Sequence, residues 1–180
     1  MTPIETERLL LRVPRREDAS ALLDFVGDPD VMRPIGSEPG GLEIAVEHLE
    51  RWIRRWEANG MGPFLVRVPG DDRVVGRVGP VVWDSGSPTW ETSTLAAAGD
   101  DAEVELGWAM GREHWGRGYA TEAARAVRQW IYDEREVERL ISLIDPENNR
   151  SIRVAEKLGA EPGETVQVPG GVATIWLHPR

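Results

Sequence analysis

The sequence predicts a single α/β (α+β) domain over residues 1–180, built on a mixed, mostly antiparallel sheet of about seven strands with flanking helices. Three observations predict this class. Strand-like and helical segments alternate along the chain, without an internal repeat, a low-complexity tract or a linker. The composition, 41% hydrophobic and 29% charged, is that of a globular domain with a core. Several strand pairs read as hairpins, so a regular doubly wound parallel sheet is not expected.

The first third of the chain is expected to form one strand and then two helices. Residues 9–13 are a short apolar run ended by Pro14, which is typical of a strand. Residues 17–26 place apolar side chains at helical spacing before a Gly-Asp-Pro stop. Residues 42–58 repeat that spacing over a longer stretch and end at Asn-Gly, so a second helix is predicted there.

A hairpin and a long connection are expected next. Residues 64–68 and 73–83 read as strands, and Pro-Gly-Asp-Asp at 69–72 has the chemistry of a tight turn between them. Residues 84–101 are rich in Gly, Ser, Thr, Ala and Asp, which predicts a long connection or a flexible flap. Such long loops in compact domains are often functional.

The second half of the chain is expected to complete the sheet. Its apolar spacing alternates between the strand and helix periods, and glycine or proline separates the segments. The expected elements are a strand at 103–110, a helix ending near 133, a strand at 138–144, a short helix through 152–158, and a closing hairpin of 165–168 with 172–177.

The charge and composition exclude several classes of function. The net charge is −10, whereas nucleic-acid binding depends on Lys and Arg neutralising phosphates, so no nucleic-acid partner is expected. A negative field favours a cationic small molecule or a basic peptide end, although the acidity is equally consistent with solubility alone. The chain has no cysteine, which excludes disulfides, thiolate metal sites and a cysteine nucleophile, and no metal site is expected.

The hydropathy pattern predicts a cytoplasmic protein with no membrane partner. No apolar run approaches the ~20 residues that a membrane span needs. Residues 1–7 carry acids where a secretory signal would carry a basic segment and then an apolar one.

The strongest local signal is a predicted strand that leads directly into Gly116 and Gly118 at the start of a helix. Two glycines let the backbone approach a ligand closely, and a helix start presents unpaired N–H groups, which suits a phosphate or pyrophosphate. A Walker loop is excluded because Tyr119-Ala120 replaces its Lys-Ser/Thr. A Rossmann fingerprint fits badly because Thr121 stands where a small residue belongs, and because the loop lies late in the chain. On its own, the pattern is equally typical of turn chemistry.

Three blocks of sequence carry a resemblance to a known family. The first joins residues 105–110, which read E-L-G-W-A-M, to residues 114–123, which read H-W-G-R-G-Y-A-T-E-A. The second is residues 6–12 and the third is residues 148–160. Their order and spacing closely resemble the GNAT superfamily of N-acetyltransferases, specifically its RimJ/RimL-like branch. One departure is Glu113, where the wider superfamily has Gln or Arg.

The resemblance implies a GNAT-like fold and a binding site for acetyl-CoA, which leaves as coenzyme A. It places the pyrophosphate on the glycine loop, with His114 close enough to touch phosphate. It also places the pantetheine arm near Asn148, although this residue is equally explained as a helix N-cap. The donor-site residues are expected to be Trp108, Ala109, Met110, His114, Gly116, Arg117, Gly118, Tyr119, Ala120, Thr121, Asn148 and Ser151.

The resemblance also implies direct transfer of acetyl to a primary amine, and this chemistry sets demands on the site. The amine must lose a proton, because a lysine-like ammonium has a pKa of ~10.4. Glu105 is expected to act as the base through water, and Glu103, two residues along the strand, could substitute. Alternatively, Glu105 is a solvated strand acid or only orients the amine. Ser151 is expected to protonate the departing thiolate, since no tyrosine follows Tyr132, unless it serves only the helix cap. The backbone of residues 107–110 is expected to bind the developing oxyanion.

Tryptophans are expected around the acceptor. Trp83, Trp90 and Trp108 lie near where this family places its acceptor and could form an apolar or cation–π wall around an amine. Glu103 is expected at the same acceptor site. The other aromatic residues are expected elsewhere, with Trp52, Trp56 and Trp130 in the core and His48 and His178 on the surface.

The sequence leaves two classes of function open. The first is an enzyme that acetylates either a protein N-terminus or a small-molecule amine, such as an aminoglycoside or a polyamine. The second is a non-catalytic acetyl-CoA-binding module, which would keep Gly116, Gly118 and Asn148 but would have no use for Glu105 or Ser151. A homodimer is common among proteins similar to this one, but the sequence itself does not determine the assembly.

Overall fold

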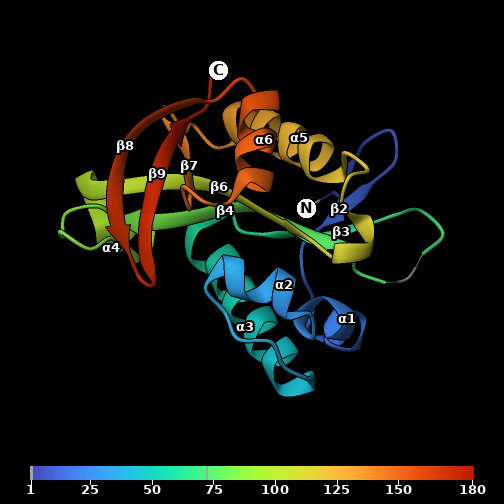
Figure 1. The fold of residues 1–180 in the computed structure, drawn as a ribbon. Coiled ribbons are helices and arrows are strands. Elements are labelled where there is room, and N and C mark those ends of the chain that lie inside the picture. The colour runs from blue at the N-terminus through green and yellow to red at the C-terminus, as the bar shows by residue number, and fades with distance from the viewer. Residues whose placement is uncertain (1, 72) are drawn as a thin grey trace.

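The computed structural model describes residues 2–71 and 73–180 as one sheet covered by helices on both faces (Figure 1). The strands are β1 (Ile4–Glu5), β2 (Leu10–Arg12), β3 (Phe64–Arg67), β4 (Gly76–Asp84), β5 (Glu91–Thr92), β6 (Ala102–Met110), β7 (Leu140–Ile144), β8 (Glu161–Val168) and β9 (Gly171–Leu177). The helices are α1 (Leu23–Val26), α2 (Pro29–Met32), α3 (Leu42–Asn59), α4 (Leu95–Ala98), α5 (Tyr119–Glu134) and α6 (Asn149–Lys157).

The sheet is mixed and mostly antiparallel, as the sequence predicts. Over the described residues it has nine strands in the order β1-β2-β3-β4-β6-β7-β9-β8, with β5 beside β4. Only the β6–β7 pair is parallel. The strand number exceeds the expected seven because β1 and β5 have two residues each, which is too short to show a period of alternation.

The three longer helices form where the apolar spacing places them. α3 ends at Gly60, whose φ of 65° lies in the left-handed region that stops a helix. α5 starts directly after the glycine loop, and α6 is followed by Gly159 at φ 75°. In Figure 1, α5 and α6 lie on one side of the sheet and α1, α2 and α3 on the other.

The single helix predicted at 17–26 is wrong in part. The chain there forms two 3-10 turns before the one-turn α1, and α2 follows after Asp28. Asp18 explains the break: it is 3% exposed, accepts a hydrogen bond from the backbone N–H of Arg15 at 2.7 Å, and pairs with the guanidinium of Arg12. An aspartate that binds its own backbone in this way favours a turn over a helix interior.

The connection predicted at 84–101 contains short elements of its own. β5 pairs with the end of β4, and Thr94 caps α4 by accepting a hydrogen bond from the N–H of Ala97 at 3.2 Å. The N–H of Leu95 donates to Asn59 at the end of α3, at 2.9 Å. These contacts tie the connection to the sheet and to α3. Of the turn predicted at 69–72, Asp72 lies outside the described residues.

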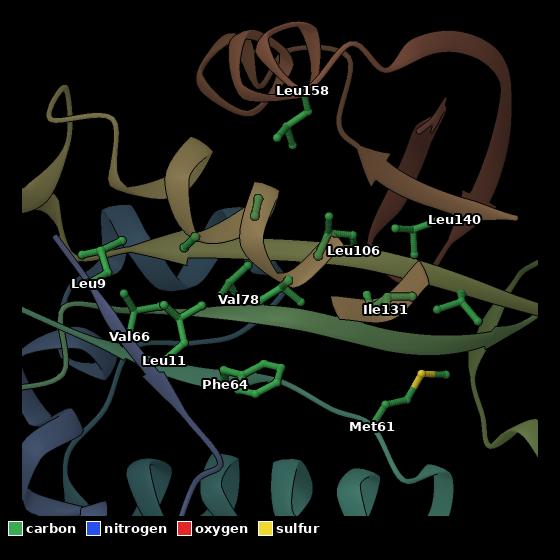
Figure 2. Close-up of a cluster of buried hydrophobic side chains, with 14 of the residues drawn as sticks. Leu9, Leu11, Met61, Phe64, Val66, Val78, Leu106, Ile131, Leu140 and Leu158 are labelled. Atoms are coloured by element: carbon green, nitrogen blue, oxygen red, sulfur yellow. The ribbon is translucent and has the colours of Figure 1, made fainter. Parts of the chain in front are cut away.

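The main core lies between the sheet and α5. Figure 2 shows Leu11, Phe64, Val78, Leu106 and Ile131, which come from β2, β3, β4, β6 and α5 and are each completely buried. The expected tryptophans join the cores. Trp56 and Trp130 meet Phe64 edge-to-face with ring centroids 4.9 Å and 5.2 Å away, and Trp52 of α3 is buried in a second core cluster.

β6 and β7 separate after a short pairing. Val104 pairs with Leu140 and Glu105 pairs with Ile141, and no further pair joins these strands among the described residues. Beyond this point the hydroxyl of Ser142 donates to the carbonyl of Leu106 at 2.6 Å, in place of a backbone bond. In Figure 1, β7 turns away from the direction of β6. The divergence opens a gap on one side of β6.

Replacing Phe64 with Ala should lower the free energy of unfolding by about 3–5 kcal/mol, because it removes a buried ring that packs against two tryptophans. Leu42→Ala is the control, since Leu42 is 56% exposed and should change stability by less than about 0.5 kcal/mol. Urea denaturation of both variants measures the difference. Equal losses would contradict the core described above.

Candidate active site

Two cavities adjoin at the gap beside β6. The first, of about 280 Å³, lies at the glycine loop and is called the glycine-loop cavity. The second, of about 500 Å³, lies between α3, β4, β6 and the β8–β9 turn and is called the central cavity. The residues that line both are Pro34, Ile35, Trp108, Asn148 and Ser151. A ligand in one cavity can therefore meet a ligand in the other at these residues.

The glycine loop presents backbone to the first cavity. Gly116 and Gly118 have φ values of 74° and 81°, in the left-handed region where a side chain is strained. Gly118 is the N-cap of α5 and provides no side chain to cap it, so the N–H groups of Tyr119, Ala120 and Thr121 begin the helix at the cavity wall. The free N–H groups and the helix dipole favour an anion here.

Eleven of the twelve residues expected at the donor site line the glycine-loop cavity. The exception is Arg117, which is exposed and whose carbonyl accepts a hydrogen bond from Arg8 at 3.0 Å. His114 is only 8% exposed and lies against Tyr119, with ring centroids 6.1 Å apart. The structure therefore brings together nearly the whole set that the sequence blocks indicated.

The structure adds three cations that sequence reasoning missed. Arg150, Arg153 and Lys157 of α6 also line the glycine-loop cavity, and the guanidinium carbon of Arg150 lies 3.7 Å from the ring centroid of Trp115. Their spacing of three and four residues places them on one face of α6. That spacing was readable in the sequence, but it is equally typical of a solvated helix face.

Asn148 and Ser151 stand at the junction of the cavities. The side chain of Asn148 accepts a hydrogen bond from the N–H of Ser151 at 3.1 Å, so Asn148 is the N-cap of α6. This cap fixes the first turn of α6 against the gap and directs Ser151 toward both cavities.

Glu105 lines the central cavity and is held there by two donors. The indole N–H of Trp83 donates to its carboxylate at 2.6 Å, and the backbone N–H of Leu143 donates as well. Burial raises the pKa of Glu105, while these hydrogen bonds and the charges of Arg77 and Arg55 oppose the rise. The alternative that Glu105 is a freely solvated strand acid is therefore wrong.

Two residues expected near the acceptor lie elsewhere. Glu103 does not line either cavity, and its carboxylate pairs with Arg139 instead. Trp90 is 9% exposed and packs with Ile141 and Ile175 in a small core. The alternation along a strand predicts only which side chains lie on the same face of the sheet. The contacts that each of them makes depend on the elements packed against that face.

His48 and His178 are buried, with 5% and 4% of each exposed, so the prediction that they lie on the surface is wrong. His48 accepts a hydrogen bond from Arg51 at 2.7 Å through Nδ1. The Nε2 of His178 lies 2.8 Å from the hydroxyl of Ser142. Since that hydroxyl already donates to Leu106, the ring nitrogen must donate to it. Both rings are packed by tertiary contacts that local sequence does not encode.

The splayed sheet, the glycine loop and the adjoining cavities together define an acyltransferase of the kind that the sequence resembles. A family model described as "Acetyltransferase (GNAT) domain" matches residues 8–161, and the chain belongs to the GNAT acetyltransferase family. Among the described residues, no helix combines the length and apolar character needed to cross a membrane.

This chain is similar in sequence to known proteins and in fold to solved structures. The uncharacterized protein YkkB of Bacillus subtilis (strain 168) is 31% identical over 167 residues, which cover 92% of this chain and 89% of YkkB. The acetyltransferase from Agrobacterium tumefaciens str. C58 is 26% identical, with a TM-score of 0.76 over 100% of this chain and 95% of that one. AAC(6')-Ib in complex with ribostamycin and coenzyme A is 20% identical, with a TM-score of 0.74 over 97% and 94% of the two chains, a likeness that shows the fold alone.

Stability should fall as the pH is lowered from about 6.5 to 4, partly through His178. Burial, with the charge of Arg128, lowers the pKa of His178 to about 4, whereas the unfolded chain binds this proton near pH 6.5. Protonation in that range therefore favours unfolding. His178→Gln should lose less stability between pH 7 and pH 5 than the unaltered chain does, as measured by urea denaturation. Equal losses would contradict a neutral, buried His178.

Proposed function

We propose that this chain transfers the acetyl group of acetyl-CoA to a primary amine. The glycine-loop cavity binds the coenzyme and the central cavity binds the amine. The observation that carries the proposal is the junction of the two cavities at Trp108, Asn148 and Ser151, where an acetyl group and an amine can meet. The complex of AAC(6')-Ib with coenzyme A and an aminoglycoside, on the same fold, supports such a pairing of sites.

The donor site fits a phosphate-rich ligand. Acetyl-CoA supplies the acetyl group as a reactive thioester. The first N–H groups of α5 and the cations Arg150, Arg153 and Lys157 bind its phosphates, because both supply donors and positive charge at one cavity. Asn148 keeps its capping role and faces the pantetheine arm with the rest of its amide.

The gap beside β6 provides a donor for the developing oxyanion. Backbone groups of alternate residues in a strand point to the same side. The carbonyl of Leu106 faces the gap, since Ser142 of β7 donates to it, so the N–H of Trp108 faces the gap too. β7 does not pair with Trp108 among the described residues, which leaves this N–H available for an acyl oxygen.

Glu105 and Ser151 move protons. Glu105 accepts the amine's proton through water, and its raised pKa makes it a better base than an exposed carboxylate. Ser151 gives a proton to the departing thiolate from the other side of the junction and takes one back from solvent water, so that its hydroxyl is restored. A non-catalytic module would have no use for a carboxylate held by two donors in the central cavity, so the geometry favours an enzyme.

The sequence blocks support a finer proposal about the branch of the family, its acceptor and its assembly. Residues 6–12 and 148–160 favour the RimJ/RimL-like branch of the family. That branch points to a protein N-terminus or a small molecule as the acceptor, and to a homodimer as the assembly.

A thiol-release assay with acetyl-CoA tests the proposal, using N-terminal peptides, amino acids, polyamines and aminoglycosides as acceptors. Glu105→Gln should lower turnover about 10²- to 10⁴-fold near neutral pH and recover in part at higher pH, where solvent deprotonates the amine. Glu103→Gln is the matched control, because Glu103 lies on the same strand but outside the cavities. An equal loss in both variants, or a loss independent of pH in Glu105→Gln, would contradict the role of Glu105.

Trp83→Phe should move the acidic limb of the pH–rate profile to higher pH. Its indole N–H stabilises the charged form of Glu105, so removing this bond raises the pKa of Glu105 further. A hydrogen bond to a charged group is worth roughly 1.5–3 kcal/mol, which corresponds to a shift of about one pH unit or more. Trp90→Phe, outside the cavities, should leave the limb in place. An unshifted profile for Trp83→Phe would rule out Glu105 as the titrating base.

A further inference from the structure

The central cavity is strongly basic, although the chain as a whole is acidic. Arg51 and Arg55 enter it from α3 and Arg77 enters it from β4, while Arg33 lies at its mouth. Their gathering at one site contrasts with the net charge of −10 for the whole chain. The local charge, not the total, determines which acceptor can enter.

Carboxylates do not balance these arginines. The acids that line the central cavity are Glu105 and the exposed Asp145, which leaves an excess of two positive charges. His48 adds no charge at neutral pH, because burial, with repulsion from the arginines, lowers its pKa to about 4.

The guanidinium groups of these three arginines also have no carboxylate partner in the part of the chain that the structure describes. Within residues 2–71 and 73–180, Arg51, Arg55 and Arg77 form no ion pair with a carboxylate, and Arg51 is hydrogen-bonded only to His48. The Nε of Arg77 is buried without a hydrogen-bond partner in this part of the chain. Burial and repulsion from its neighbours lower the pKa of Arg55 to about 10. Arg51, Arg55 and Arg77 are half-buried. A charge withdrawn from solvent without an opposite charge beside it is costly, and such groups cluster at functional sites.

One of these arginines lies beside the proposed base. A Cβ placed on Gly107 would lie 3.1 Å from Nη1 of Arg77 and 3.4 Å from Oε1 of Glu105, so the two groups flank the same glycine. An amine that reaches Glu105 therefore has a guanidinium within a few ångström. A second positive charge on the acceptor would be repelled there, and a negative one would be bound.

We propose that the acceptor is a small primary amine that also carries an oxyanion, either a carboxylate or a phosphate, and that Arg51, Arg55 and Arg77 bind this group. The inference rests on the proposed acetylation of an amine. A cavity of about 500 Å³ suits a small molecule. The three arginines do not line the glycine-loop cavity, so the phosphates of the coenzyme are not their ligand. The net charge of the chain favours a cationic acceptor, but the arginines that line the central cavity favour an anionic one.

The test compares four short amines in the thiol-release assay, together with calorimetric binding that does not depend on turnover. The amines are γ-aminobutyrate with a carboxylate, O-phosphoethanolamine with a phosphate, neutral ethanolamine, and dicationic putrescine. We expect the kcat/KM of at least one anionic amine to exceed that of putrescine by about 100-fold. The two anionic amines distinguish the carboxylate from the phosphate.

Arg55→Gln should weaken binding of the preferred anionic amine about 10- to 100-fold and leave binding of acetyl-CoA unchanged. Arg54→Gln is a matched control, because its side chain is 65% exposed and pairs with Glu50 on the outer face of α3. Arg51→Gln serves as a second variant if Arg55→Gln does not fold.

The outcomes separate the inference from the proposed function. Absence of turnover with every acceptor of both panels would overturn the proposed function, and calorimetric binding of an anionic amine that is lost in Arg55→Gln would then uphold only the ligand chemistry assigned to the arginines. Turnover that prefers putrescine or ethanolamine, or an equal effect of Arg54→Gln and Arg55→Gln, would overturn the inference alone. Turnover with acidic N-terminal peptides but with none of the small anionic amines would overturn the small-molecule assignment.

Discussion

The separation of β6 from β7 is the constraint on which both cavities depend. A complete ladder between these strands would close the gap and occupy the backbone groups that face it. The chain instead pairs only two residues of each strand and satisfies the next groups with side chains. Ser142 donates to the carbonyl of Leu106, and the indole of Trp115 donates to that of Met110 at 2.7 Å. Between these two carbonyls, Trp108 keeps its backbone open toward the junction of the cavities, so the proposed site lies where the β6–β7 ladder is not formed.

A strand with one open side must be held firmly on the other. β6 pairs with β4 along its entire length, from Ala102 opposite Asp84 to Met110 opposite Gly76. α5 packs against the same strand through fully buried side chains such as Leu106 and Ile131. The long β4–β6 ladder and the dense core therefore offset the backbone hydrogen bonds that β6 does not form with β7. They also restrict the movement of β6, the strand that positions the carboxylate of Glu105.

Features with a local signal could be predicted from the sequence. The apolar stripe of α3, the strand before Gly116 and the helix after it are encoded by neighbouring residues, and they appear as expected. Features that depend on distant contacts could not be predicted. The turn at Asp18 depends on Arg12 and Arg67, and the burial of His178 depends on Ser142. The polar side of α3 carries His48, Arg51 and Arg55 at helical spacing, and in the sequence this pattern is typical of a solvated helix face. In the structure the same side lines the central cavity together with Arg77 of β4.

In the proposed reaction, the arginines of the central cavity connect binding of the acceptor to the proton affinity of Glu105, the proposed base. Arg77 and Arg55 favour the charged form of Glu105 and so hold its proton affinity down. An oxyanion bound between the guanidinium groups would offset this field, and the proton affinity of Glu105 would then rise. The rise would come when the ammonium of the same acceptor lies beside the carboxylate and must lose its proton. A cationic acceptor would produce the opposite change, because it adds to the positive field and weakens the base it needs. The charge pattern therefore favours an anionic acceptor for two reasons. The arginines bind its oxyanion, and the bound oxyanion raises the proton affinity of the proposed base.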